Sequence, residues 1–306
     1  MASYVRDRLL LAFFVLWGAL TIVFVAVRVI PGDPAMLMVG PQGSRQDVEA
    51  VRRRLGLDAP LSAQYGRYLA GALRLDFGQS LWLGKPAVRA VGERLPATAL
   101  LAVTATVLGV GLGLPLGIVA AIRAHSPLDA FVRTVSLLGQ SVPNFWLGIM
   151  LILVFARQLQ WLPSSGMGEL RHLVLPTVTL ALLLVGVLTR LVRSGLVEVM
   201  SEDYIRSAYA KGLARAMVIT KHALPNMLIP VVTIVGLQLG NLLAGAVIVE
   251  TVFAWPGSGR LLVEAIGQRD YPVVQVAVLF ITAAFIVINL LVDISYAYLD
   301  PRIRYR

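Results

Sequence analysis

Long apolar stretches recur along the chain and are separated by more polar segments. A helix needs about 20 apolar residues to cross a bilayer core of roughly 30 Å. Stretches of this length cover residues 9–27, 97–122, 131–156, 173–192, 227–249 and 273–297. The pattern predicts an all-α membrane protein with six transmembrane helices.

The composition supports the membrane class and narrows the chemistry. Of the 306 residues, 58% are hydrophobic and only 14% are charged, which is far from the composition of a soluble globular domain. A net charge of +10 would suggest nucleic-acid binding in a soluble chain, but in a membrane protein topology is the first explanation. The absence of cysteine excludes disulfides, a thiolate nucleophile and a Cys-ligated metal.

Lysine and arginine predict the orientation, because they are enriched in short cytoplasmic loops. Among the short loops and the tail they concentrate in the segment 190–221 and in residues 300–306, whereas the long outer segment 28–94 holds ten but largely escapes this rule because of its length. The two short loops expected outside hold only Arg157, Arg171, Arg260 and Arg269. Both termini are therefore expected in the cytoplasm, and residues 1–30 should form a retained anchor helix because no clear cleavage site follows the first stretch.

The segment 31–95 predicts a helical cap on the outer side. Ser44 fits the N-cap of one amphipathic helix, and Gly56 fits its C-terminal end. A second helix should follow Pro60, with Ser62 as its N-cap. Its apolar stripe should comprise Tyr65, Leu69 and Leu73. The pattern favours packing of this cap on the outer ends of the spans over substrate gating.

Polar side chains inside the apolar stretches are candidates for lining a translocation path. They are Gln140, Asn144, Gln238, Asn241 and Asn289, with Asp293 near the inner end of the last stretch. The members of each pair are three or four residues apart, so they should share a helical face. Such groups either face an aqueous path or form interhelical hydrogen bonds, and the sequence leaves both open. No stretch carries paired ionisable groups at its midpoint, which argues against a proton relay.

Motifs of enzyme chemistry are missing from the sequence. The three histidines have no metal-ligand spacing, and neither Gly-x-Ser-x-Gly nor His-Glu-x-x-His occurs. The nearest approach to a phosphate-binding loop, residues 78–85, has the wrong glycine spacing and is followed by Pro86 instead of Ser or Thr. A membrane-embedded hydrolase is therefore disfavoured, and any ATP would have to be bound by another chain.

The segment 201–213 predicts a short cytoplasmic helix with both ends specified. Ser201 fits the N-cap, acidic residues follow it, and Gly212 supplies a C-terminal stop. One face would hold Tyr204, Ile205, Ala208 and Tyr209, and the opposite face Asp203, Arg206 and Ser207. This helix could lie on the membrane surface, pack on the chain's own loops or dock into another protein, and the pattern alone leaves all three open.

The same segment resembles the cytoplasmic signature loop of ABC importer permeases of the dipeptide, oligopeptide and nickel branch. That loop typically reads Tyr-x-Arg-x-Ala-x-Ala-Lys-Gly-Leu, followed by His-Ala-Leu-x-Asn and Ile-Pro. The matching residues are Tyr204, Arg206, Ala208, Ala210, Lys211, Gly212, Leu213, His222, Ala223, Leu224, Asn226, Ile229 and Pro230. The general permease motif begins Glu-Ala-Ala, whereas this chain has Arg206, Ser207 and Ala208 there.

Further stretches resemble this branch in order along nearly the whole chain. They are PGDPA from Pro31, GLDAPL from Gly56, LDFGQS from Leu75, FAWPGSGR from Phe253, RDYPVVQ from Arg269 and LDPRIRY from Leu299. The resemblance implies a permease subunit of a bacterial ABC importer in the inner membrane, foremost one for di- and oligopeptides. Glutathione-like tripeptides and nickel chelates are alternative substrates, and a self-sufficient secondary transporter is the contrasting class.

The resemblance also implies an assembly and a division of roles. The expected partners are a second homologous permease, two cytoplasmic ATPase subunits or domains and an extracytoplasmic solute-binding protein, with no nucleic acid. This chain would be non-catalytic and bind no cofactor, because ATP and Mg²⁺ would be used by the ATPases.

Site residues and domain limits follow from the same resemblance. A coupling helix that fits a groove on an ATPase would use Tyr204, Ile205, Arg206, Ala208, Lys211, Gly212 and Leu213. The expected domains are the anchor 1–30, the extracytoplasmic cap 31–95, the transmembrane domain 96–299 with its coupling loop 193–226, and the cytoplasmic basic tail 300–306.

Overall fold

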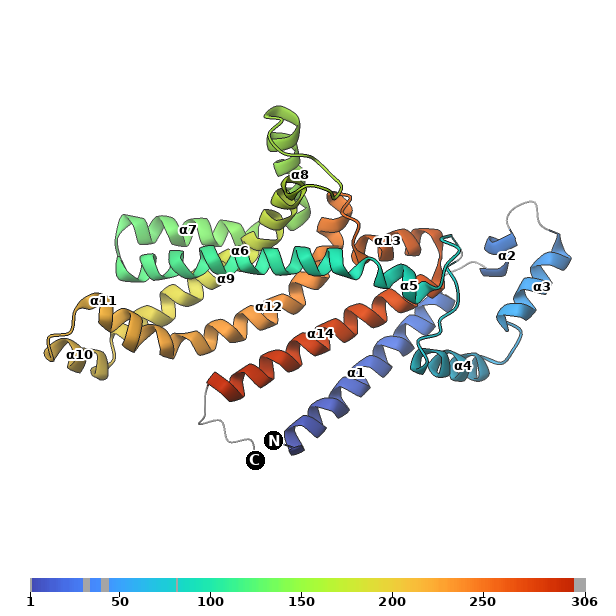
Figure 1. The fold of residues 1–306 in the computed structure, drawn as a ribbon, viewed down its shortest axis with the longest axis horizontal. Coiled ribbons are helices and arrows are strands. Elements are labelled where there is room, and N and C mark those ends of the chain that lie inside the picture. The colour runs from blue at the N-terminus through green and yellow to red at the C-terminus, as the bar shows by residue number, and fades with distance from the viewer. Residues whose placement is uncertain (1, 30–33, 40–43, 81, 300–306) are drawn as a thin grey trace. The chain divides into compact units, whose positions relative to one another are not determined.

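The computed structural model describes residues 2–29, 34–39, 44–80 and 82–299, and its fold is drawn in Figure 1. Every regular element within these residues is a helix, apart from an isolated antiparallel bridge between Gln79 and Pro86. The all-α class is therefore confirmed for the described part of the chain. Two compact units divide it, and each is described by itself.

The first unit comprises Ala97–Pro256 and the described residues from Phe285 onward. Its helices are α6 (Leu95–Ile122), α7 (Pro127–Ser141), α8 (Asn144–Leu151), α9 (Leu170–Met200), α10 (Asp203–Ala210), α11 (Arg215–Met217) and α12 (Leu224–Val252), with the π-helical segments η1 (Ile152–Gln158) and η2 (Val218–Ala223).

The second unit comprises Ala2–Pro96 and Gly257–Ala284. It contains α1 (Ala2–Val29), α2 (Pro34–Val39), α3 (Arg45–Leu55), α4 (Leu61–Leu73), α5 (Ala87–Gly92) and α13 (Ser258–Gln268), and α14 (Tyr271–Leu299) contributes residues to both units.

Five of the six predicted spans correspond to helices that are long and apolar enough to cross a membrane. These helices are Arg6–Val29, Ala87–Ile122, Leu170–Met200, Pro230–Val252 and Tyr271–Val292. The sixth, predicted over residues 131–156, is broken, because α7 and the segment formed by α8 and η1 meet at 103°. Pro143 explains the break, since proline lacks an N–H and pushes the residue before it out of the helical conformation. Val142 is accordingly extended, at φ −81° and ψ 123°.

The break changes one expectation about the path candidates. Gln140 lies in the last turn of α7, whereas Asn144 begins α8. The prediction that these two side chains share a helical face is therefore wrong, because no continuous helix joins them.

α9 is the central helix of the first unit. Its side chains Leu180, Leu184, Leu188, Val192 and Leu196 are fully or almost fully buried. α6 approaches α9 through glycines, and a Cβ atom built on Gly117 would lie only 2.5 Å from the Cβ of Val192. Small residues permit such close helix packing in membranes, where apolar burial alone does not hold helices together.

The cap helix α3 has the predicted ends. The Ser44 side chain accepts a hydrogen bond from the Asp47 N–H, and the Asp47 carboxylate accepts one from the Ser44 N–H, which together form a capping box. The hydrogen bonds from Ser44 lower the pKa of Asp47. Gly56 ends the helix in the left-handed conformation, at φ 65°.

The second cap helix, α4, differs from its prediction at both ends. Pro60 occupies the N-cap position and its carbonyl accepts from the N–H groups of the first turn, so Ser62 already lies inside the helix and the assignment of Ser62 as the N-cap is wrong. Tyr65 and Leu69 are half-buried as predicted, but Leu73 is 87% exposed because the helix ends there. Its inner face instead includes Tyr68, whose ring lies 5.5 Å from that of Phe24 on α1. Burial raises the pKa of the Tyr68 phenol.

Candidate functional site

The short helix predicted within residues 201–213 is present as α10, between α9 and α11. Ile205 is fully buried and Ala208 is 6% exposed, and both belong to the hydrophobic core of the first unit together with Val218 and Ala223 of η2. Packing on the chain's own loop therefore accounts for the centre of its apolar face. Tyr204 and Tyr209, at the edges of that face, remain 42% and 38% exposed.

The C-terminal end of α10 is built as its glycine predicts. Gly212 is in the left-handed conformation at φ 78°. The Gly212 N–H donates to the Tyr209 carbonyl, and the Leu213 N–H donates to the Ala208 carbonyl. These two bonds form a Schellman motif and satisfy carbonyls that a helix end otherwise leaves unpaired.

The N-terminal end of α10 contradicts its prediction. The N-cap residue is Glu202, in an extended conformation. Ser201 instead ends α9, and its hydroxyl donates to the Glu198 carbonyl at 2.6 Å. The assignment of Ser201 as the N-cap is wrong because the preceding helix already uses this side chain.

Polar side chains cover the outward surface of α10. Arg206 and Asp203 form an exposed ion pair at 3.3 Å, and Lys211 is exposed at the C-terminal end of the helix. The Tyr204 hydroxyl accepts a hydrogen bond of 2.8 Å from the Asn226 amide, which lies in the first turn of α12. α10 is therefore anchored through its inner face and its Tyr204 edge, and its outward surface is a mixture of charged and aromatic side chains.

The path candidates fall at separate places in the first unit. The Asn241 amide donates to the Gln238 side-chain oxygen at 2.8 Å, so these two share a face of α12 as predicted. Gln140 donates to the Ser136 carbonyl of its own helix at 3.1 Å. Asn289 is half-buried on α14, and the side chain of Asp293 lies outside the described residues.

Asn144 reaches the same side of α12. Its amide nitrogen lies 3.6 Å from the position that a Cβ on Gly245 would occupy. Gly245 follows Asn241 by four residues and Gln238 by seven, so all three lie along one face of α12. The structure thus brings Asn144 toward Gln238 and Asn241, and it leaves Gln140 on the other side of the break.

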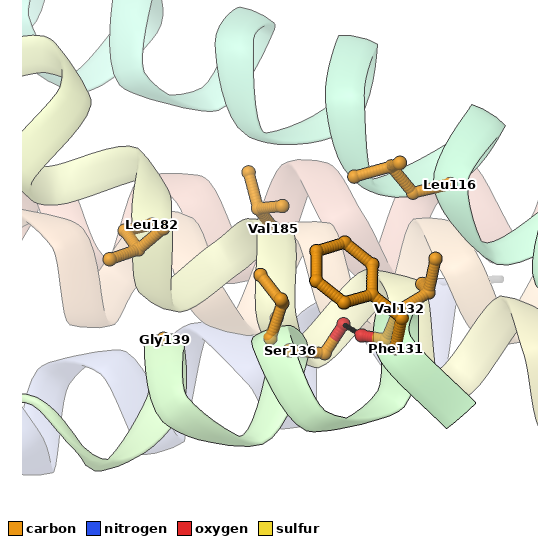
Figure 2. Close-up of a pocket in the computed structure, with 9 residues that line it drawn as sticks. Leu116, Phe131, Val132, Ser136, Gly139, Leu182 and Val185 are labelled. Atoms are coloured by element: carbon orange, nitrogen blue, oxygen red, sulfur yellow. Dashed lines mark hydrogen bonds between the residues drawn. The ribbon is translucent and has the colours of Figure 1, made fainter. Parts of the chain in front are cut away.

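A small pocket lies between α6, α7 and α9 (Figure 2). Leu116, Phe131 and Val185 form much of its wall, and its volume is about 80 Å³. The Ser136 hydroxyl donates to the Val132 carbonyl at 2.7 Å, so the pocket offers an apolar surface. A space of this size and polarity suits an aliphatic group and cannot hold a peptide.

Two features of ionisable residues bear on the chemistry of the site. Within the described residues, no group of three or more His, Cys, Asp or Glu side chains is placed to hold a metal ion. Glu250, near the end of α12, is fully buried, and Thr98 of α6 donates to its carboxylate at 2.6 Å. The indole N–H of Trp255 donates to the Ala97 carbonyl at 2.9 Å, so two polar contacts fasten the end of α12 to the start of α6.

Sequence reasoning missed Glu250 because it searched for ionisable groups at the midpoints of spans. Glu250 lies one residue beyond the stretch 227–249, where a carboxylate is expected to be exposed at the membrane boundary. Its position inside the otherwise apolar run VIVETVFAW is the signal that could have identified it.

Comparison with known families identifies the architecture. Residues 113–305 match the family described as "Binding-protein-dependent transport system inner membrane component", and residues 1–102 match the corresponding N-terminal family. The chain belongs to this family. It is therefore an ABC importer permease with several membrane-spanning helices, and permeases of this class work with ATPase and binding-protein components.

Relatives and solved structures agree with this assignment. The permease is 43% identical over all 306 residues to the glutathione transport system permease protein GsiC of Escherichia coli K12, and likewise to GsiC of Salmonella paratyphi A, with full coverage of both chains. Its fold is similar to that of the MetNI methionine ABC transporter in inward-facing conformations. That match has a TM-score of 0.59 and 19% identity, and it covers 69% of this chain and 96% of the other.

Proposed function

We propose that this permease forms, with a second homologous permease, the path by which short peptides enter the cell, and that glutathione is the first substrate to test. The observation that carries this proposal is the full-length identity of 43% with permeases named for glutathione transport. Di- and oligopeptides share the amide and carboxylate groups of glutathione, so the same path could serve them, with selection made by the solute-binding protein.

The proposed path is lined by Asn144, Gln238, Asn241 and Asn289, with Gln140 on the far side of the break in the third span. Uncharged amides can donate to and accept from peptide groups. Because they are uncharged, they also bind the substrate less tightly than a buried charge would, so the substrate can leave the path again.

The proposed role of α10 is to receive the motion of an ATPase subunit. The helix is held in place by Ile205 and Ala208, which belong to the hydrophobic core, and by Leu213, which packs against it. Gly212 ends the helix in the left-handed conformation. Tyr204, Arg206 and Lys211 then form the docking surface. ATP and Mg²⁺ would be bound by the ATPases, this chain would perform no catalysis, and both termini would lie in the cytoplasm, as the basic loops predict.

Uptake by the reconstituted complex tests this function. The permease, its second permease, the ATPases and the binding protein would be assembled in proteoliposomes and supplied with labelled glutathione, a dipeptide and a nickel chelate in turn. We expect uptake of glutathione or the dipeptide that needs both ATP and the binding protein. Uptake of the nickel chelate alone would refute the substrate class. Uptake driven by an ion gradient, with this chain as the only protein, would establish a secondary transporter instead.

A further inference from the structure

Two arginines connect the turn between α6 and α7 to the two sides of α10. Arg193 lies on α9, which precedes α10, and Arg215 lies on α11, which follows it. Arg193 binds Asp129 at the start of α7, and Arg215 binds the carbonyl of Ile122 at the end of α6. The turn, residues 123–126, is thus held from both flanks of the helix that we propose to dock on the ATPase.

The first link is a buried, two-pronged ion pair. Asp129 is fully buried, and Arg193 donates to its two oxygens through Nε at 3.0 Å and Nη2 at 2.8 Å. Bidentate pairing fixes the relative orientation of the two side chains as well as their distance. Arg133, one turn further along α7, also lies 3.4 Å from the Asp129 carboxylate, but with a single contact. Removing Asp129 or Arg193 would therefore abolish the two-pronged contact between α7 and α9, while Arg133 can only balance the charge of Asp129 within α7 itself.

Asp129 is also bound firmly to the turn itself. Its backbone N–H donates to the Ser126 hydroxyl at 3.2 Å, and its Oδ2 accepts from the His125 N–H at 2.9 Å. His125 is in the left-handed conformation, at φ 66°. A displacement of Arg193 would therefore carry the whole turn with it, because the carboxylate that it binds is itself bonded to the turn's backbone.

The second link is made at a helix end. Arg215 Nη2 donates to the carbonyl of Ile122, the last residue of α6, at 2.8 Å. The last carbonyls of a helix have no intrahelical partner and carry partial negative charge, so a guanidinium is a favourable partner there.

Apolar packing around the second link is incomplete. A cavity of about 260 Å³ separates the end of α6 from α9 and η2, with Ala124, Leu196, Met200 and Ile219 among its walls. Ala121, in the last turn of α6, nevertheless packs against the hydrophobic core. The Arg215 bond therefore adds a polar contact to this packing at the end of α6.

α7 continues from the turn to the broken span. Along its length it packs tightly on α9, where a Cβ built on Gly186 would lie 2.6 Å from the Ser136 carbonyl oxygen. α7 ends at Ser141, and α8 begins after the break with Asn144 facing α12. A movement of the turn along the α7 axis would consequently reach the break and the polar face of α12.

We propose that Asp129, Arg193 and Arg215 are positioning residues that make the α6–α7 turn move as one body with α10. ATPase motion would then reach the broken span through α7, in addition to its direct route along α9 and α12. This inference rests on the proposed docking role of α10, and its experiments separate the two.

The coupling between ATP hydrolysis and uptake provides the first test. The full complex would carry Asp129→Asn, Arg193→Gln or Arg215→Gln, and Arg190→Gln would serve as control because Arg190 is an exposed arginine of the same helix, one turn from Arg193. We expect each of the three variants to move about fivefold less substrate per ATP hydrolysed, the lower end of coupling factors between linked sites. The control should keep the ratio of the unaltered complex.

Two double variants show whether the links act as the geometry requires. Asp129→Asn with Arg193→Gln should be no worse than the more affected single variant, because both changes break one contact. Asp129→Asn with Arg215→Gln should lower the ratio further, because it breaks both links. An unchanged ratio in every variant, or uptake and ATPase activity that fall together with the amount of assembled complex, would overturn the inference and leave these residues a purely structural role.

A distance measurement tests the rigid link without reference to any substrate. The chain has no cysteine, so Ala130→Cys on α7 and Ser207→Cys on α10 can be labelled selectively with spin labels. We expect one narrow distance distribution that is the same in the nucleotide-free and the ATP-trapped complex, and a broader one after Asp129→Asn with Arg215→Gln. A distance that changes between the two nucleotide states in the unaltered chain would refute the single body, whatever the complex transports.

Discussion

Substitution of two glycines of α6 tests how closely this helix approaches α9. Gly117 faces α9, and a Cβ built there would meet the Val192 Cβ at 2.5 Å and the Thr189 carbonyl oxygen at 2.8 Å. Gly111 lies in the interior of the same helix, and a Cβ built there has no heavy atom within 4 Å. Gly117→Ala and Gly111→Ala therefore make the same chemical change in the presence and in the absence of a neighbour.

The magnitude follows from the atoms that Gly117→Ala would meet. Carbon atoms pack at about 3.5–4.0 Å, so the two helices would have to separate by about 1 Å. Neither obstacle can rotate away, because one is a backbone oxygen and the other a Cβ fixed to the backbone. Overpacking of this kind costs about 1–3 kcal/mol. The gain in helix propensity from Gly to Ala, about 1 kcal/mol, is common to both variants and cancels in their comparison.

Thermal unfolding of the purified permease in detergent measures the difference. A change of 1 kcal/mol shifts Tm by about 2–4 °C in a chain of 150–250 residues, so we expect Gly117→Ala to melt about 2–12 °C below Gly111→Ala. Equal melting temperatures for the two variants would show that α6 and α9 do not approach as closely as described. The glycines of this stretch would then have another role.

Three further predictions concern α10, the buried acid and the cap. Gly212→Val places a β-branched side chain at φ 78° and should destabilise the last turn of α10 by about 1–2 kcal/mol, seen as faster amide exchange there. Gly212→Asn should leave the exchange rate nearly unchanged, and equal rates in the two variants would contradict the left-handed conformation at this end. Glu250→Ala removes the hydrogen bond between Thr98 and the buried carboxyl group and should lower the stability by about 1–3 kcal/mol, more than Glu250→Gln, as measured by Tm. Because Ser44 lowers the pKa of Asp47, the capping box stabilises α3 fully above the unfolded pKa of about 3.9 and loses this effect as the pH falls through the lower folded pKa. Amide exchange in α3, corrected for its intrinsic rate, should become faster in that pH window, and an unchanged rate would refute the capping box.

Features that depend on short segments could be predicted from the sequence. Length and apolarity define a span locally, and five of the six predicted spans are single helices of the described chain. Glycine ends at Gly56 and Gly212 were also predictable, because a left-handed residue favours glycine whatever surrounds it. N-caps were less predictable, because the side chain of Ser201 had two possible partners and the sequence does not show that Glu198 is the one it binds.

The inner face of α10 shows why burial was harder to predict. The sequence offered no obvious partner for Ile205 and Ala208, yet both are buried against η2. η2 is a π-helix, whose i→i+5 bonding does not have the 3.6-residue period by which apolar faces are recognised. The partner was therefore present in the sequence but not visible as an amphipathic helix.

Contacts between distant residues could not be predicted, and they reorganise the candidate site. Gln140 and Asn144 have the spacing of one helical face, but Pro143 interrupts the helix between them. Asn144 instead approaches Gly245, on the face of α12 that carries Gln238 and Asn241. Three of the path candidates, Asn144, Gln238 and Asn241, therefore lie between α8 and α12 instead of along a continuous third span, because α7 and the segment after the break meet at 103°. A substrate that forms hydrogen bonds with these amides would lie beside the break, and a shift of α7 would reach the break before any other part of the path.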